Sequence, residues 1–97
     1  MELFEWDPAK AEINWRKHGV KFEDAAQLFL GLMSTWNTSR GSEVRFASIG
    51  VIEETALVVV WTPRENVIRI ISARRARRGE RRRLVQDLGR STAAWRN

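Results

Sequence analysis

The chain contains one histidine, and a lysine precedes it in the pair Lys17-His18. Histidine exchanges a proton near neutral pH, and a neighbouring lysine can offset the charge that builds on a phosphate during cleavage. The alternative is structural, because cations near the end of a helix interact favourably with the helix dipole. A histidine acting as general acid or base in this chain can only be His18.

Glu43 and Arg45 lie two residues apart in a segment with the pattern of a β-strand, so they share one face. A carboxylate beside arginines can take a proton from a ribose 2′-hydroxyl, and the arginines stabilise the five-coordinate phosphorus that follows. An exposed Glu–Arg pair is also ordinary on a strand and contributes little stability. The sequence is compatible with both interpretations.

Arg69 lies between Ile68 and Ile70 in an otherwise apolar strand, and its side chain points to the face opposite both isoleucines. Such an arginine needs an anion. A phosphate is the functional alternative, and a carboxylate such as Glu43 or Glu80 is the structural one, which is the commoner arrangement in small domains.

Arginine makes up seven of the ten residues from Arg74 to Arg83. Arg74 follows a predicted strand, where exposed groups usually act, and we predict that it binds phosphate. Arginines at spacings of three and four on a solvated helix repel one another, and a bound polyanion would relieve this repulsion. The predicted nucleic-acid-binding residues are Arg75, Arg77, Arg78, Arg81 and Arg82.

Charge is distributed unevenly along the 97 residues, whose net charge is +5. Residues 1–60 hold six Lys/Arg and nine Asp/Glu, whereas residues 61–97 hold eleven arginines and three acids. Arginine grips phosphate at two points and stacks on bases, so nucleic acid is the expected polyanion, although an acidic protein would also fit.

Composition also limits the class of protein. The length suits a single domain over residues 1–97, and the absence of cysteine with only one histidine leads us to expect no metal and no cofactor. We find no signal peptide or membrane span, and we expect a soluble, cytoplasmic protein.

Two helices are predicted near the N-terminus. The first has Asp7 as N-cap, Pro8 at its first position and Gly19 as its stop, with Ala9 and Ile13 on its buried face. The second covers residues 22–30, where apolar residues recur at spacings of three and four.

Strands and a last helix follow. Strands are predicted over residues 44–51, 56–62 and 67–73, with a possible edge strand over 32–36, and the apolar run 57–61 should be central and covered on both faces. A helix over residues 76–88 should end at Gly89, and the tail 90–97 is unassigned and possibly flexible. The expected fold class is α+β, with two N-terminal helices, a three- to four-stranded antiparallel sheet and a C-terminal helix.

Several motifs together resemble one known family. They occur in this order: Phe4-Glu5-Trp6-Asp7-Pro8-x-Lys10, Asn14-x-x-Lys17-His18-Gly19-Val20-x-Phe22-Glu23-x-Ala25, Glu43-x-Arg45 with Ile49-Gly50, Arg69-Ile70-Ile71-Ser72-Ala73-Arg74-Arg75-Ala76, and Glu80-Arg81. Over residues 4–83 the chain resembles the BrnT ribonuclease toxins of type II toxin–antitoxin systems.

The resemblance implies a RelE-like fold and a metal-independent endoribonuclease that arrests translation. It also implies a BrnA-like antitoxin, a DNA-binding protein whose complex with the toxin represses their operon. Carried over by position, the catalytic candidates are Lys17, His18, Glu43, Arg45, Arg69 and Arg74.

The mechanism that combines these residues holds the scissile phosphate between Arg45, Arg69 and Arg74. Glu43 or His18 would deprotonate the 2′-hydroxyl, and His18 or Lys17 would assist the leaving 5′-oxygen, giving a 2′,3′-cyclic phosphate product. The rival interpretation is a non-catalytic module whose arginines only hold nucleic acid or an acidic protein.

Overall fold

A computed structural model describes residues 3–96, with side chains as far as residue 88. The elements in chain order are β1 (Phe4–Glu5), α1 (Pro8–His18), α2 (Phe22–Ala26), the 3₁₀ helix η1 (Gln27–Leu30), β2 (Met33–Asn37), β3 (Phe46–Ile52), β4 (Thr55–Arg64), β5 (Val67–Arg75) and α3 (Arg78–Arg96). The α+β class is as expected.

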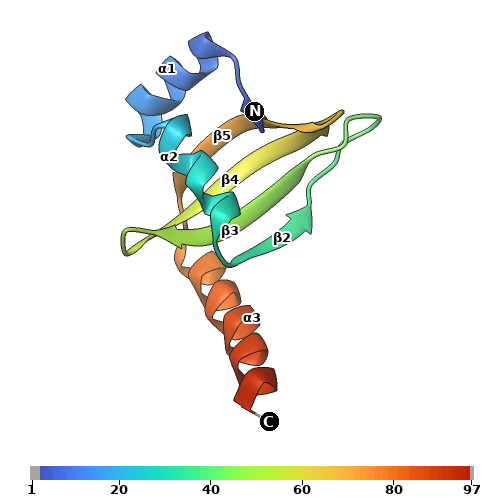
Figure 1. The fold of residues 1–97 in the computed structure, drawn as a ribbon. Coiled ribbons are helices and arrows are strands. Elements are labelled where there is room, and N and C mark those ends of the chain that lie inside the picture. The colour runs from blue at the N-terminus through green and yellow to red at the C-terminus, as the bar shows by residue number, and fades with distance from the viewer. Residues whose placement is uncertain (1–2, 97) are drawn as a thin grey trace.

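The sheet has five strands in the order β1-β5-β4-β3-β2 (Figure 1). Strands β2 to β5 form the expected antiparallel meander, with the edge strand β2 present. The prediction of a purely antiparallel sheet of three to four strands is wrong, because β1 pairs with β5 in parallel through Phe4↔Ile68 and Glu5↔Arg69. Two residues are too few to give a periodic signal.

Helix α1 begins and ends where the sequence predicts. The Asp7 side chain accepts a hydrogen bond from the Ala9 N–H at 2.8 Å, and Gly19 closes the helix with φ 68°. The predicted buried face is wrong, because Ala9 is exposed and Ile13 is 62% exposed. The buried residue of α1 is the polar Asn14, and the helix contacts the sheet through this side chain.

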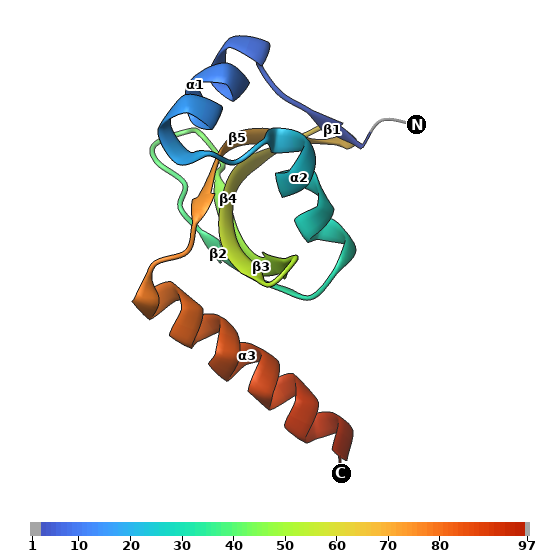
Figure 2. The ribbon, with the colours of Figure 1, turned by 90° about the vertical axis from the view of Figure 1, so that its left-hand side faces the viewer.

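Each face of the sheet has its own core. On one face, α2 and η1 pack with Leu57, Val59, Ile70 and Ala73 of β4 and β5, and the sheet curves around them (Figure 2). On the other face, Ala76 and Leu84 pack against residues of β3 and β4 that include Ile49 and Val58. Strand β4 is therefore central and covered on both faces, as predicted.

Helix α3 lies on the face of the sheet away from α2, and it projects beyond the body of the protein (Figures 1 and 2). The prediction that it ends at Gly89 is wrong: its backbone continues to Arg96 and takes in most of the tail expected to be unassigned. Asn97 and the side chains from Gly89 onward lie outside the described part of the chain.

Candidate functional site

A hollow of about 310 Å³ opens on the face of the sheet that α3 covers in part. Ala47, Val58 and Val60 come from β3 and β4 and belong to the core on this face. The border is polar and aromatic, and its residues are Trp36, Thr38, Arg40, Arg45, Arg74 and Glu80. Three arginines against one glutamate give this hollow a positive field.

The strand register explains how β5 supplies Arg74. Residues directly opposite each other in an antiparallel pair share a face, and Arg74 lies opposite Val58. Arg75 lies opposite Leu57, which belongs to the core on the other face. The two consecutive arginines therefore leave the strand on opposite faces, and only Arg74 borders the hollow.

Arg74 is paired with Glu80 at two points. Its Nη1 donates to Glu80 Oε1 at 2.8 Å and its Nη2 donates to Oε2 at 2.7 Å. Glu80 also accepts the Arg77 backbone N–H at 2.8 Å, so this carboxylate caps the first turn of α3. The hydrogen bonds from Arg74, with a smaller contribution from Arg77, lower the pKa of Glu80 to about 2, and Glu80 in turn raises the pKa of Arg74.

The connection between β2 and β3 brings Arg40 and Arg45 to the hollow. The Thr38 N–H donates to the Arg45 carbonyl at 2.8 Å, and Arg40 and Glu43 exchange two backbone hydrogen bonds across a turn that includes Gly41 at φ 58°. Arg40 was not among the predicted site residues, although the glycine at residue 41 was a signal for a turn that folds Arg40 back.

Glu43 lies beside the hollow rather than in its border, and it pairs with Arg45. Its Oε1 accepts from Arg45 Nη2 at 2.5 Å and from Nε at 3.2 Å. This pair is exposed, so solvent screens it and an incoming anion can replace the carboxylate at little cost.

Lys17 and His18 border a different hollow, of about 200 Å³, next to Ile71 and Ser72 of β5. Lys10 also borders it, so three basic side chains meet there, and among the described residues no carboxylate lines it. Ser72 lies opposite Val60 and so shares its sheet face with Arg74. The two basic hollows therefore flank the same stretch of β5.

Asn14 fixes α1, and with it His18, against β5. Its Nδ2 donates to the carbonyls of Val20 and Ala73, at 3.0 and 2.9 Å, and its Oδ1 accepts the Ala73 N–H at 3.1 Å. Asn14 was not among the predicted site residues, because a polar residue in a helix is usually exposed. The spacing from Asn14 to His18, one helical turn, places His18 at the same strand.

Arg69 is not in the border of either hollow. Its Nη1 donates to Glu5 Oε2 at 3.1 Å across the β1–β5 pair. The structure pairs Arg69 with a carboxylate, as in the structural alternative, although neither suggested partner, Glu43 nor Glu80, is the one found. The carboxylate comes from a strand that the sequence did not predict.

The remaining predicted arginines separate into two groups. Arg78, Arg81 and Arg82 line a shallow basic surface of α3 together with Val85, and the Arg77 N–H is used in the helix cap. Arg75 borders a hollow on the opposite face of the sheet. The dense arginine run in the sequence is therefore not one continuous surface.

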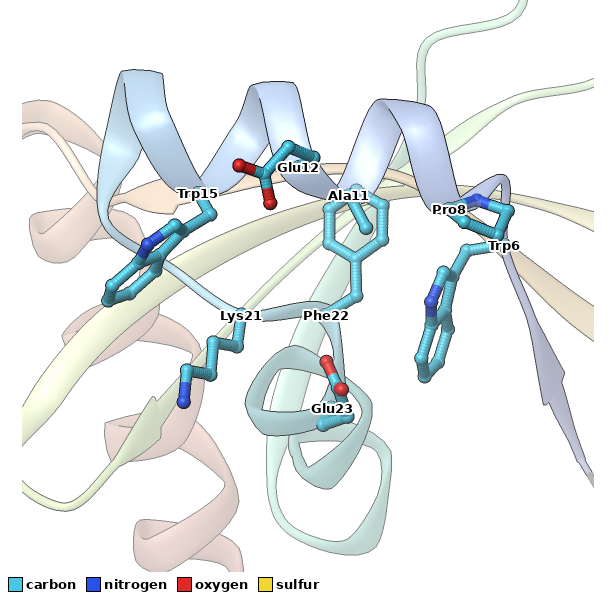
Figure 3. Close-up of a pocket in the computed structure, with 8 residues that line it drawn as sticks. All are labelled: Trp6, Pro8, Ala11, Glu12, Trp15, Lys21, Phe22 and Glu23. Carbon is cyan, nitrogen blue, oxygen red and sulfur yellow. The ribbon is translucent and has the colours of Figure 1, made fainter.

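Another hollow, of about 360 Å³, lies between α1 and the start of α2, with Phe22 between the two tryptophans (Figure 3). Lys21 Nζ lies 5.5 Å from the centroid of the Trp15 ring. Trp6, Trp15 and Lys21 line it together with the acidic Glu12 and Glu23. With two carboxylates to one lysine, it does not suit a phosphate.

Residues 3–96 contain no group of three or more His, Asp or Glu side chains placed to hold a metal ion. No helix in the same range combines the length and the apolar composition needed to cross a bilayer.

Comparison with protein families gives a match to BrnT, described as the ribonuclease toxin of type II toxin–antitoxin systems, over residues 6–80. The chain belongs to the BrnT family. The matched residues include α1, the sheet from β2 to β5 and the beginning of α3, and so every element that borders the two basic hollows. No curated protein matches the chain.

Proposed function

We propose that this BrnT protein is a metal-independent endoribonuclease that cleaves RNA at the two basic hollows flanking β5. A single observation supports this site above others: Arg40, Arg45 and Arg74 converge on one hollow, and His18 lies in the next, along the same strand. Cations that bind the phosphate and a side chain that transfers protons are the two requirements of this chemistry.

The arginines bind the phosphate by competing with carboxylates of the protein. Glu43 is displaced readily from the exposed pair with Arg45. Arg74 stays paired with Glu80 through Nη1 and Nη2, and the mechanism assigns its remaining N–H donors to the substrate phosphate. Arg40 adds a third cation. Arg69 is left out of the mechanism, because it borders neither of the two basic hollows.

Cleavage is a transesterification in which the ribose 2′-oxygen attacks the phosphorus and the bond from phosphorus to the 5′-oxygen breaks. Glu43 or His18 accepts the 2′-hydroxyl proton, and His18 or Lys17 stabilises or protonates the departing 5′-oxygen. The arginines stabilise the charge on the five-coordinate phosphorus. The products are a 2′,3′-cyclic phosphate and a 5′-hydroxyl end.

In the cell, we propose that cleavage occurs in the cytoplasm and stops translation, and that a BrnA-like antitoxin neutralises the toxin. The antitoxin, rather than this chain, would contact operator DNA in the complex. The type II toxin–antitoxin family of the chain supports the existence of such a partner.

The experiment is incubation of the purified protein with single-stranded RNA in EDTA, with mass spectrometry of the fragment ends. Fragments that end in 2′,3′-cyclic phosphate are expected. RNA that is bound but stays intact at enzyme excess supports the non-catalytic binding module instead, and cleavage that disappears with EDTA contradicts metal independence.

A further inference from the structure

Trp36 is the aromatic residue of the arginine hollow, and the proposed cleavage assigns it no role. It lies in the edge strand β2 opposite Ala47, a small residue that belongs to the floor of the hollow. The indole is half-buried and packs against the core on this face. An apolar floor, an aromatic wall and an arginine border suit a nucleobase joined to a phosphate.

Arg83 of α3 holds the indole in place. Its guanidinium carbon lies 4.8 Å from the centroid of the Trp36 ring, within the range of a cation–π contact. Arg83 does not itself line the hollow, whereas Trp36 does. The half-buried indole therefore contacts Arg83 and also borders the hollow.

Thr38 borders the same hollow and supplies a second, independent observation. Its Oγ1 is buried and, in the described part of the chain, has no hydrogen-bond partner. Buried polar atoms in native proteins are nearly always paired, and an orphaned one beside a hollow indicates a missing partner. The hydroxyl both donates and accepts, so a rotation of the side chain that turns it into the hollow would let it bond to the edge of a base.

We propose that Trp36 and Thr38 form a nucleobase subsite, in which one base of a single-stranded RNA stacks on the indole while Thr38 bonds to its edge. The adjoining phosphate then lies at Arg45 and Arg74. The inference rests on the proposed function for the identity of the polyanion, and it adds a determinant of which base is placed beside the scissile phosphate.

The test measures binding of 2′-O-methyl oligonucleotides, which lack the attacking hydroxyl and stay intact. Homopolymers of the four bases are compared with a chain of abasic residues of equal length. Trp36→Leu should weaken binding to the homopolymers by about 5- to 100-fold and leave binding to the abasic chain unchanged. Trp36→Phe, which keeps an aromatic face, should recover most of the affinity.

Thr38→Val removes only the hydroxyl, so it should leave thermal stability unchanged or higher while it alters the order of affinity among the four homopolymers. Trp15→Leu is the matched control, since Trp15 is 47% exposed and lies in the hollow between α1 and α2. It should bind all of the oligonucleotides as the wild type does.

Two results would overturn the subsite: Trp36→Leu with wild-type affinity, or a loss of equal size for the base-containing and abasic chains. An unchanged order of affinity in Thr38→Val would remove Thr38 from the proposal. Failure of the proposed function would give a different result. If Trp36→Leu weakens binding as expected but the wild-type protein leaves unmodified RNA intact, the protein has the subsite without the ribonuclease activity.

Discussion

The side chain of Asn14 binds the backbone of Ala73, 59 residues away, as a neighbouring strand would, donating to its carbonyl at 2.9 Å and accepting its N–H at 3.1 Å. Beyond the short pair with β1, this edge of β5 is covered by α1. The asparagine thus substitutes for a strand and sets the position of the helix that carries Lys17 and His18.

Asn14→Leu should lower the free energy of unfolding by about 2 to 5 kcal/mol, because it leaves buried backbone groups of Ala73 and Val20 without partners. Urea unfolding measures the change. Asn37→Ala is the control, since Asn37 accepts one exposed hydrogen bond from Ser39 and should change stability by less than about 1 kcal/mol. Equal effects of the two substitutions would contradict the role of Asn14.

Glu80 should make stability depend on acid pH. Its pKa in the folded protein is about 2, below the ordinary 4.5, so its contribution is present above pH 4.5 and is lost as the pH falls toward 2. At pH 7, Glu80→Gln should cost about 1 to 3 kcal/mol, because it weakens the pair with Arg74 and the helix cap.

The measurement is the difference in unfolding free energy between wild type and Glu80→Gln across pH 2 to 7. That difference should shrink below pH 4.5. Glu12→Gln, which breaks an exposed pair with Arg16, should cost little at any pH. If the difference in unfolding free energy between wild type and Glu80→Gln stayed constant down to pH 2, the pKa of Glu80 would not be lowered by folding.

Leu84 and Val85 are consecutive residues of α3 with opposite environments. Leu84 is 4% exposed in the core beneath the helix, and Val85 is 70% exposed. Leu84→Ala should therefore lower stability by about 2 to 5 kcal/mol, whereas Val85→Ala should change it by less than about 0.5 kcal/mol. Chemical denaturation of both variants checks this, and a large loss for Val85→Ala would place α3 in a different rotation about its axis.

Arg74→Ala and His18→Ala should reduce RNA cleavage much more than RNA binding. In the proposed mechanism, His18 transfers a proton and Arg74 stabilises the charge on the five-coordinate phosphorus. Loss of either kind of group typically lowers the rate by about 100-fold or more, while the other cations continue to hold the RNA. Single-turnover cleavage and filter binding measure the two effects. Arg64→Ala, an exposed arginine at the end of β4, is the control and should change neither. Equal losses of cleavage and binding in either variant would count against a catalytic role for that residue.

Local signals in the sequence predicted much of the fold. Asp7-Pro8 and Gly19 specify the ends of α1 through caps that depend only on neighbouring residues. The apolar run in β4 predicted a strand buried on both faces. Gly89 was misread because glycine in a helix costs only about 1 kcal/mol, and so does not always end one.

The candidate site depended on contacts that no local pattern encodes. Arg74 and Arg75 are equivalent in sequence, and only the register of β4 and β5 sends them to opposite faces. Likewise, the pairing of Arg69 with Glu5 required β1, and the meeting of Arg40 with Arg74 required the loop between β2 and β3 to fold over the sheet. The sequence identified most of the basic residues but not which of them meet.

The parallel pairing of β1 with β5 has a consequence during synthesis. Strand β1 can pair only after β5 has been synthesised, and α1 can dock only after Ala73 has been synthesised. A nascent chain therefore leaves the ribosome with its N-terminal segment unpaired until nearly the whole sequence has been translated. At about 5 to 20 residues per second, this delay lasts for seconds. An incomplete chain thus lacks the docked α1 that carries His18, so the proposed site is not assembled until synthesis is nearly complete.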